Sequence, residues 1–263
     1  MKTRGFTLLE IIIAMAVMGI LMVSFIQFFV GSLKTAQDID NRSELVTEGQ
    51  IAHQLISARL QEAWHLLPPG TSVALSHTAA WMITKPSGGT TWTVESATEP
   101  FMAMVLPPTN LGQTCSSTDT RGCYRFFAYY SITRSSYVSN TSNRANDRLI
   151  SDPSNPGAWV LMQYRGFIPS GTVTSGSTSV TVTPASLWDI RADLLADYVV
   201  PVNSSLTFSN YQPFDMIGTA APFRVVLDLR FSRSVQGRTI QLGGTSDSLR
   251  SEVLARNQGQ LAP

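Results

Sequence analysis

A single carboxylate within a long apolar run is the chemically most unusual feature of this 263-residue chain. From Phe6 to Val30 the only charged residue is Glu10. A charged side chain at the centre of a bilayer costs about 2.5 to 3.5 kcal/mol on insertion scales, so such a residue needs a polar partner or a route to the lipid headgroups. Glu10 is therefore the first candidate for a functional residue.

The two cysteines, Cys115 and Cys123, form the second candidate pair. We expect them to be oxidised, because the apolar run described below places this part of the chain outside the cytoplasm. Closing this span of nine residues stabilises a fold by about 2.6 kcal/mol in the chain-entropy model. The pair predicts a structural disulfide.

The spacing of the three histidines gives little support for a metal site. His53 and His65 lie twelve residues apart on a predicted helix, which is about 18 Å along its axis and too far to share a zinc ion. His77 follows a proline break. We expect no metal site and no cofactor.

Loop acids and nucleophiles also give no clear catalytic pattern. Asp119, Asp147 and Asp152 lie in predicted loops where calcium could bind, but EF-hand spacing is missing and solvated acids are the preferred interpretation. The sequence has no Gly-x-Ser-x-Gly elbow and no phosphate-binding glycine loop. We expect the protein not to be an enzyme and to bind no small-molecule substrate.

The aromatic run Tyr124–Tyr130 lies beside Arg121, Arg125 and Arg134, as a stacking platform for single-stranded nucleic acid would. On a strand, however, alternate side chains point to one face and would form sheet core. The formal net charge of +1 gives no broad footprint for DNA. We prefer core packing and expect no nucleic-acid partner. The side chains on that face would be Tyr124, Phe126, Ala128 and Tyr130.

The element that carries Glu10 is predicted to cross a membrane once. Lys2 and Arg4 precede the apolar run, so the N-terminus should stay cytoplasmic and the chain after Lys34 should be exported. As a helix, residues 6–30 would be about 37 Å long, enough for a bilayer core of about 30 Å. We expect a protein that crosses the membrane once and has an exported C-terminal part.

The leader differs from an ordinary secretory signal, because the small residue lies before the apolar core and the segment Gly31–Lys34 is a poor cleavage site. An uncleaved signal anchor is the simplest alternative. The string Gly5-Phe6-Thr7-Leu8-Leu9-Glu10, however, resembles the class III leader junction of type IV pilins and pseudopilins. This resemblance implies a protein of the bacterial inner membrane, cleavage after Gly5 by a prepilin peptidase, and N-methylation of Phe6.

Two interpretations of Glu10 follow. The first is that Glu10 reaches the headgroups and favours the positive end of the helix dipole. The second depends on the resemblance: cleavage creates a cationic amine at Phe6, and the amine of a neighbouring subunit meets Glu10 when helices stagger along a filament. We prefer the second interpretation, in which the helix binds other pilins.

The helix is expected to continue beyond the membrane, since no proline occurs between Met1 and Leu67. We predict one helix over Phe6–Trp64, with an amphipathic second half that ends before Pro68. Gly19, Gly31 and Gly49 are places where it could bend. Its apolar stripe is predicted to contain Leu45, Ala52, Leu55, Ile56, Leu60, Ala63 and Trp64, and its solvated face Asp38, Asp40, Arg42, Glu44 and Glu48.

The chain after Pro69 is predicted to be rich in β-strands. Phe223–Arg233 alternates most clearly and predicts a half-buried antiparallel strand. Ala185–Leu195 is expected to form a short helix opened by Pro184, and Ser135–Gly157 a surface loop. The other predicted strands are Ala80–Thr84, Thr90–Glu95, Met102–Leu106, Tyr124–Arg134, Trp159–Phe167, Ser179–Thr183 and Tyr198–Phe208.

These patterns together predict an α+β protein in which a long N-terminal helix packs on an exported antiparallel sheet. The expected parts are a leader (1–5), a membrane and assembly helix (6–31), its amphipathic continuation (32–67) and an exported domain (68–263). The segments Leu195–Val200, Phe223–Arg233 and Ser248–Asn257 also resemble the C-terminal pattern of PilW-type minor pilins and J-type pseudopilins.

The resemblance implies a structural function, a minor pilin that enters or primes a type IV pilus at the cell surface. A pseudopilin of a type II secretion system has the same leader and is the nearest alternative. A signal-anchored exported enzyme or adhesin is a further alternative. A competence pilin that contacts DNA would need a basic patch that the linear sequence lacks.

Overall fold

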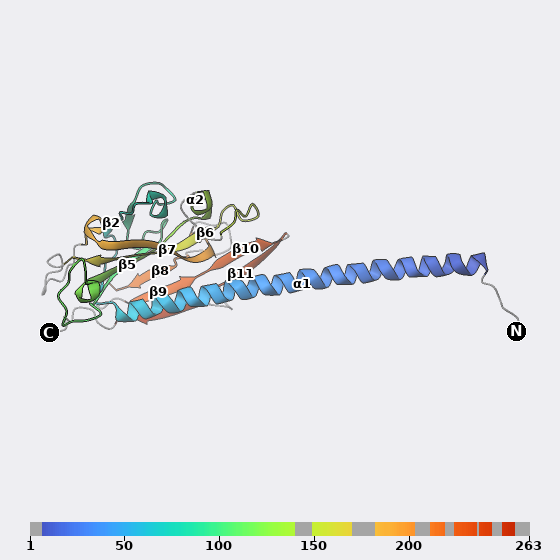
Figure 1. Ribbon diagram of the computed structural model, residues 1–263, viewed down its shortest axis with the longest axis horizontal. Helices are drawn as coiled ribbons and strands as arrows, with labels where there is room; N and C mark the ends of the chain where they lie inside the picture. Colours follow the sequence, from blue (N-terminus) through green and yellow to red (C-terminus); the bar gives the residue numbers. More distant parts are fainter. Residues whose placement is uncertain are drawn as a thin grey trace. The chain divides into compact units, whose positions relative to one another are not determined.

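The fold is described from a computed structural model, which covers residues 7–139, 149–169, 182–202, 211–218, 224–235, 237–243 and 249–255. Gly5, Phe6 and Asp147 therefore lie outside the described residues, as do most of the predicted strand Ser179–Thr183 and the second half of Tyr198–Phe208. The chain divides into two compact units, Met1–Glu44 (unit 1) and Leu45–Pro263 (unit 2). Helix α1 and the antiparallel sheets of unit 2 make this an α+β fold (Figure 1).

Helix α1 contains 55 residues, Leu8–Glu62, and belongs to unit 1 up to Glu44. The prediction of one long helix is confirmed, although the helix ends at Glu62 rather than Trp64. The amide of Trp64 already donates to the carbonyl of Val105 at 2.9 Å, so the chain enters the sheet directly after the helix. The buried residues of the helix recur at spacings of three and four and form the predicted amphipathic stripe; they are Leu45, Gly49, Ala52, Ile56 and Leu60.

Unit 2 contains three antiparallel sheets. The large sheet has the strand order β1-β4-β5-β6-β7-β10-β11, the second has the order β12-β9-β8, and β2 pairs with β3. Figure 1 shows these strands coloured along the chain. Their bounds are β1 His65–Leu66, β2 Ser72–Ala74, β3 Thr91–Thr93, β4 Phe101–Leu106, β5 Tyr124–Thr133, β6 Trp159–Ile168, β7 Trp188–Val199, β8 Phe214–Ile217, β9 Arg224–Leu229, β10 Phe231–Val235, β11 Arg238–Leu242 and β12 Leu249–Leu254.

The unit 2 part of α1 packs on one face of both larger sheets. The guanidinium of Arg59 lies over the Phe127 ring of β5, 5.2 Å from its centroid. Further along the helix, His53 Nε2 lies 2.9 Å from the Ser251 hydroxyl of β12. The helix thus bridges the two sheets and closes one side of a common hydrophobic core.

A smaller layer covers the other face of the large sheet. Trp92 of β3 packs against Tyr130 of β5 with ring centroids 4.8 Å apart and the rings tilted by 48°. The Tyr130 hydroxyl donates to the carbonyl of Met82 at 2.9 Å, and the Tyr164 hydroxyl donates to that of Ser76 at 2.8 Å. Because both faces are covered, seven consecutive residues of β5 are buried. The aromatic run therefore forms part of the sheet core, and the preferred interpretation of core packing is confirmed.

The predicted helix over Ala185–Leu195 is wrong. Pro184 opens only the short 3-10 helix η4, Pro184–Ser186, and the chain then forms the twelve-residue strand β7. Strand β7 pairs with β6 over most of its length. Apolar and charged residues alternate from Trp188 to Leu194, which is the period of a strand.

Two further strand predictions are corrected. Ala80–Thr84 contains the 3-10 helix η1, Ala80–Met82, rather than a strand. The predicted strand Phe223–Arg233 is divided at Arg230 into β9 and β10, which belong to different sheets. Strand β9 is also buried from Val225 to Leu229 instead of half-buried, and its one acid in that range, Asp228, accepts from Arg230 Nη2 at 2.8 Å.

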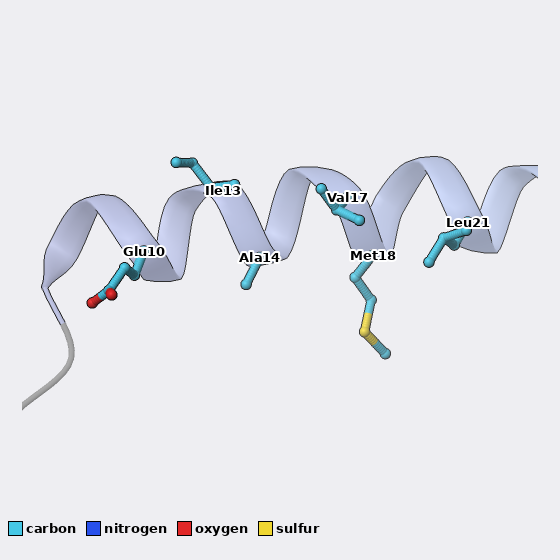
Figure 2. A pocket seen from close by; sticks show the side chains of 6 residues that line it. All are labelled: Glu10, Ile13, Ala14, Val17, Met18 and Leu21. Carbon is cyan, nitrogen blue, oxygen red and sulfur yellow. The ribbon is translucent and has the colours of Figure 1, made fainter.

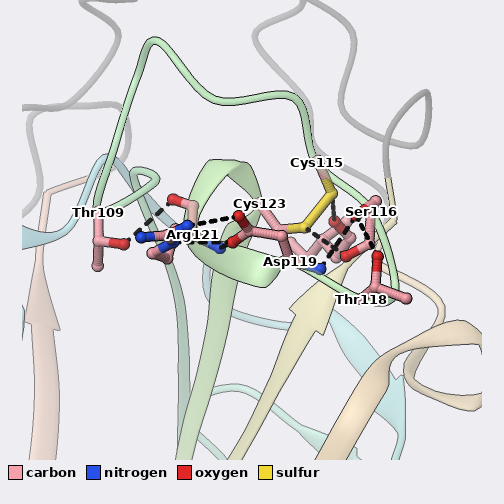
Figure 3. Close-up of a disulfide and its surroundings, with 8 residues drawn as sticks. Thr109, Cys115, Ser116, Thr118, Asp119, Arg121 and Cys123 are labelled. Atoms are coloured by element: carbon pink, nitrogen blue, oxygen red, sulfur yellow. Dashed lines mark hydrogen bonds and ion pairs between the residues drawn. A yellow bond between two sulfur atoms is a disulfide. The ribbon is translucent and has the colours of Figure 1, made fainter.

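Two loop regions flank the large sheet. The segment predicted as a loop after Ser135 begins with a short helix, α2, over Arg134–Ser139. The loop between β4 and β5 contains the 3-10 helix η2, Thr120–Gly122, and the predicted Cys115–Cys123 disulfide, which is confirmed (Figure 3). Asp119 orders this loop, since both of its carboxylate oxygens accept from Arg121, at 2.9 and 2.7 Å.

Candidate functional site

The N-terminal part of α1 presents an apolar surface without cover from the described residues of the chain. Every large apolar side chain from Leu8 to Val30 is between 44% and 77% exposed. Such a surface is far larger than the apolar patches that water-soluble monomers tolerate. By length and composition the helix could cross a bilayer, and its exposed side chains suit contact with lipid or with other helices.

Glu10 and Thr7 form a capping box at the start of this helix. The amide and the hydroxyl of Thr7 both donate to Glu10 Oε2 at 2.9 Å, and the Glu10 amide donates to the Thr7 hydroxyl at 3.3 Å. The Thr-x-x-Glu pattern was visible in the sequence, but its capping role was missed. The box holds the carboxylate at the first turn, next to the predicted cleavage junction.

Glu10 also heads an apolar stripe along the helix. The stripe residues recur at spacings of three and four and therefore share one face. They line a shallow groove of about 430 Å³ (Figure 2), formed by Glu10, Ile13, Ala14, Val17, Met18 and Leu21. The groove combines one carboxylate with flexible apolar side chains, which suits packing against another helix.

One polar side chain within the apolar part, Ser24, is satisfied locally. The Ser24 hydroxyl donates to the carbonyl of Ile20, one turn earlier, at 3.0 Å. A serine bonded in this way carries no unmet polar group into an apolar environment. The helix surface around it can therefore remain in lipid or in a helix bundle.

The comparisons with known proteins bear on this N-terminal segment. A family model described as the prokaryotic N-terminal methylation motif matches residues 1–26. Neither a comparison with curated proteins nor one with solved structures finds a match for the chain. The matched segment contains the junction of Gly5 and Phe6, Glu10 and the whole apolar stripe that Glu10 heads.

This match supports a type IV pilin-like or pseudopilin-type exported protein. A leader of this type implies processing by a prepilin peptidase and a pilin-family assembly context. The apolar helix and the leader together fit a membrane-anchored, exported protein.

The three histidines lie apart in the fold. His53 contacts Ser251, His65 belongs to β1, and the His77 ring accepts from the Ala79 amide at 3.0 Å. Burial lowers the pKa of His53 and of His65. Within the described ranges, no group of three or more His, Cys, Asp or Glu side chains is placed to hold a metal ion.

The arginines beside the aromatic run are bound within the protein. Arg125 donates to the carbonyl of Pro107 at 3.2 Å and lies 3.5 Å from Glu62. Arg134 is buried against Asp197, with Nε 2.9 Å from Oδ1. Arg121, the third, is exposed and paired with Asp119. All three arginines pair with acids of the same chain, and of the three Arg134 is buried, Arg125 half-buried and Arg121 exposed.

Two acids predicted to be solvated have structural partners. Asp152 accepts from the Tyr198 hydroxyl at 2.9 Å and from the Asn155 amide at 2.8 Å. Glu48 is half-buried, and its Oε1 accepts from the backbone N–H of Asp197 at 2.6 Å. The interpretation of Glu48 as part of a solvated face is therefore wrong, and a long-range contact of this kind leaves no local signal in the sequence.

Proposed function

We propose that this protein is a minor pilin, a structural subunit without enzymatic activity. In this proposal a prepilin peptidase cleaves after Gly5, Phe6 is N-methylated, and α1 holds the subunit in the inner membrane with its N-terminus cytoplasmic. The subunit then enters, or primes, a type IV pilus. The observation that carries the proposal is a methylation-type leader followed by an exposed apolar helix that carries one carboxylate, Glu10.

The exposed apolar surface supports assembly through helices. Side chains such as Leu8 and Phe28 are more than two thirds exposed, and removal of apolar surface from water is the main driving force of association. Lipid covers the helix before assembly, and the helices of other pilins cover it afterwards. Repeated head-to-tail contacts whose rotation does not close give a helical filament.

The geometry of the capping box supports a second role for Glu10. Both bonds from Thr7 reach Oε2, whereas a carboxylate has about four acceptor positions on its two oxygens. The box does not require Oε1, and we assign this oxygen to the cationic N-terminus of a neighbouring subunit. An ion pair of this kind would be strong among apolar helices, where the effective dielectric constant is low.

A pseudopilin of a type II secretion system is the competing assignment, because it has the same kind of leader. A deletion strain separates the two. Loss of surface filaments with normal protein secretion supports the minor pilin, whereas normal filaments with loss of secreted proteins supports the pseudopilin. Normal filaments together with normal secretion would contradict both and favour a signal-anchored protein that never polymerises.

Complementation of that strain tests the junction. A Gly5→Val variant places a β-branched side chain at the cleavage site and should remain unprocessed and fail to restore filaments. Glu44→Ala removes a carboxylate from the same helix outside the apolar run and should restore filaments fully. Restoration by unprocessed Gly5→Val would contradict the proposed maturation.

A further inference from the structure

A small cleft of about 210 Å³ lies in unit 2, on the hairpin of β10 and β11. Three segments that are far apart in the sequence line it: the loop 154–158, the end of β7 with the residues after it (199–201), and the hairpin itself. Because no single segment contains the whole lining, sequence analysis did not predict this cleft.

Hydroxyl groups are the main polar groups of the cleft. Ser232 and Ser234 lie two residues apart on β10 and therefore share one face, and Thr239 is the register partner of Ser234 on β11. The hydroxyls of Ser234 and Thr239 lie 2.9 Å apart, and each keeps further bonding capacity, since a hydroxyl both donates and accepts. Within the described part of the chain, the hydroxyls of Ser154 and Ser232 have no hydrogen-bond partner. The cleft thus offers four hydroxyls to a ligand.

None of the described lining residues carries a charge. Arg233 lies between the two serines of β10, but alternate side chains of a strand point to opposite faces, and its guanidinium lies over the Tyr198 ring, 4.6 Å from the centroid. Residues 199–201, two valines and a proline, give the cleft an apolar wall. A charged ligand would lose hydration here without gaining a counter-charge. The lining therefore suits a neutral ligand that has both hydroxyls and a C–H surface.

The segments that line the cleft are bonded to one another. The Asn155 side chain pairs with both backbone groups of Ser234, accepting from its amide at 2.6 Å and donating to its carbonyl at 2.9 Å, as a neighbouring strand would. Asp152 accepts from the Asn155 side chain at 2.8 Å and from the Tyr198 hydroxyl of β7 at 2.9 Å. These bonds connect the loop, β10 and β7 before any ligand arrives, and such preorganisation lowers the cost of binding.

We propose that this cleft binds one neutral sugar ring. Hydroxyls of the ring bond to Ser154, Ser232 and Thr239, and its C–H surface lies against residues 199–201. The cleft is smaller than the pockets of about 300 to 1,000 Å³ that hold drug-sized ligands, so it takes one ring rather than a longer chain. A ligand of this size is expected to bind with a dissociation constant on the order of 1 mM. The sugar is a ligand and not the substrate of a reaction, and the site does not depend on assembly into pili.

Saturation-transfer NMR on the full-length chain tests this proposal. The chain is held in micelles of a phosphocholine detergent, which has no sugar headgroup, and the probes are the methyl glycosides of glucose, galactose and mannose. At least one of them should bind, and the matching uronic acid glycoside should bind more weakly, because its carboxylate meets no cation in the described lining. Competition by neutral oligosaccharides of the sugar that binds distinguishes a free sugar from the end of a glycan chain.

Two glycines provide a blocking variant and its control. A Cβ at Gly157, in the lining, would meet nothing within 4 Å, and a Cβ at Gly112, in the loop between β4 and β5, would make only an ordinary contact of 3.6 Å with Asn110 Oδ1. Gly157→Leu should fold, fill the cleft and abolish binding, whereas Gly112→Leu should bind the sugar as the parent protein does. Thr239→Val and Ser154→Ala, at exposed positions, should each weaken binding about threefold to tenfold, the effect of losing one hydrogen bond.

The proposal is overturned if none of the three glycosides gives a saturation-transfer signal at concentrations well above the expected dissociation constant. It is equally overturned if Gly157→Leu and Gly112→Leu bind the sugar equally well, because the sugar would then bind elsewhere on the chain. If circular dichroism finds Gly157→Leu unfolded, unchanged affinity in both Thr239→Val and Ser154→Ala has the same meaning.

Discussion

Thr7 and Glu10 hold each other at the first turn of α1, with the Thr7 amide and hydroxyl each 2.9 Å from Glu10 Oε2. This arrangement shows the carboxylate as a local cap, and the proposed function gives it a second role as a charge offered to a neighbouring subunit. The two roles make different demands on the side chain, because an uncharged amide can cap a helix but cannot form an ion pair.

Substitution of these two residues should separate the roles. Glu10→Gln keeps an oxygen for the capping box but removes the charge, and we expect normal processing with incorporation into filaments reduced about tenfold or more, the effect of losing a bond to a charged group. Thr7→Ala removes the cap, which costs the helix about 1 kcal/mol, but it keeps the charge of Glu10. We therefore expect Thr7→Ala to be incorporated into filaments much better than Glu10→Gln. Quantitative immunoblots of sheared filaments measure the incorporation of each variant. Equal incorporation of Glu10→Gln and the parent protein would leave only the cap as a role for Glu10.

The buried ion pair of Arg134 and Asp197 should contribute strongly to the free energy of unfolding of unit 2. Their side chains are only 6% and 4% exposed, and burial raises the pKa of Asp197 while Arg134 opposes that rise. Asp197→Ala leaves a buried guanidinium without its partner and should lower the free energy of unfolding by about 3 to 5 kcal/mol. Chemical denaturation of the detergent-solubilised chain measures this change.

A double variant provides the control for that prediction. Arg134→Met combined with Asp197→Leu removes both charges, and we expect it to be more stable than Asp197→Ala alone, because no buried charge remains uncompensated. A double variant less stable than the single one would indicate that the pair contributes net stability beyond avoiding a lone charge.

Gly49 and Gly31 give a matched pair of glycines in one helix. A Cβ at Gly49 would lie 2.6 Å from Leu249 Cδ1 and 2.9 Å from Phe231 Cε2, whereas a Cβ at Gly31 meets nothing within 4 Å. Gly49→Ala should therefore lower the free energy of unfolding by about 1 to 3 kcal/mol through overpacking. Gly31→Ala should have no such cost and should favour the helix by roughly 0.5 to 1 kcal/mol. Thermal unfolding measures the stability of both variants. If Gly49→Ala is more stable than Gly31→Ala, the close packing of α1 on β10 and β12 is contradicted.

The contact between His53 and Ser251 predicts a pH dependence of stability. Burial lowers the pKa of His53 in the folded protein, so the neutral form is favoured on folding. The associated stability is present above the unfolded value of about 6.5 and is lost as the pH falls through the folded value. The parent protein should therefore lose more stability than His53→Gln between pH 7.5 and pH 5.5, as measured by denaturant midpoints.

The other half-buried histidine does not disturb this comparison. Burial also lowers the pKa of His65, but His65 is present in both proteins and its effect cancels. Identical losses in the parent protein and His53→Gln would show that His53 is not desolvated between α1 and β12.

The long helix and the strand-rich domain were predictable because their signals are local and periodic. The stripe from Leu45 to Leu60 repeats every three or four residues, and the boundaries of β4, β5 and β6 were predicted to within one residue of those found. The disulfide was also predictable, since only two cysteines exist and they lie close in sequence.

The errors have physical causes that differ from one element to another. Pro184 and the leucines near Leu194 favoured a helix, but the alternation from Trp188 onward was the stronger signal and pairing with β6 settled the structure. The division of Phe223–Arg233 between two sheets depends on neighbours far away in the chain, and so does the partner of Glu48. Contacts of this kind could not be derived from one sequence.

The central claim is that maturation of the leader exposes a new N-terminus on an assembly helix. Mass spectrometry of the N-terminal peptide, from protein extracted from the membrane of its native host, tests this claim most directly. We predict a peptide that begins at an N-methylated Phe6. A peptide that still begins at Met1, or one that begins after Val30, would contradict it.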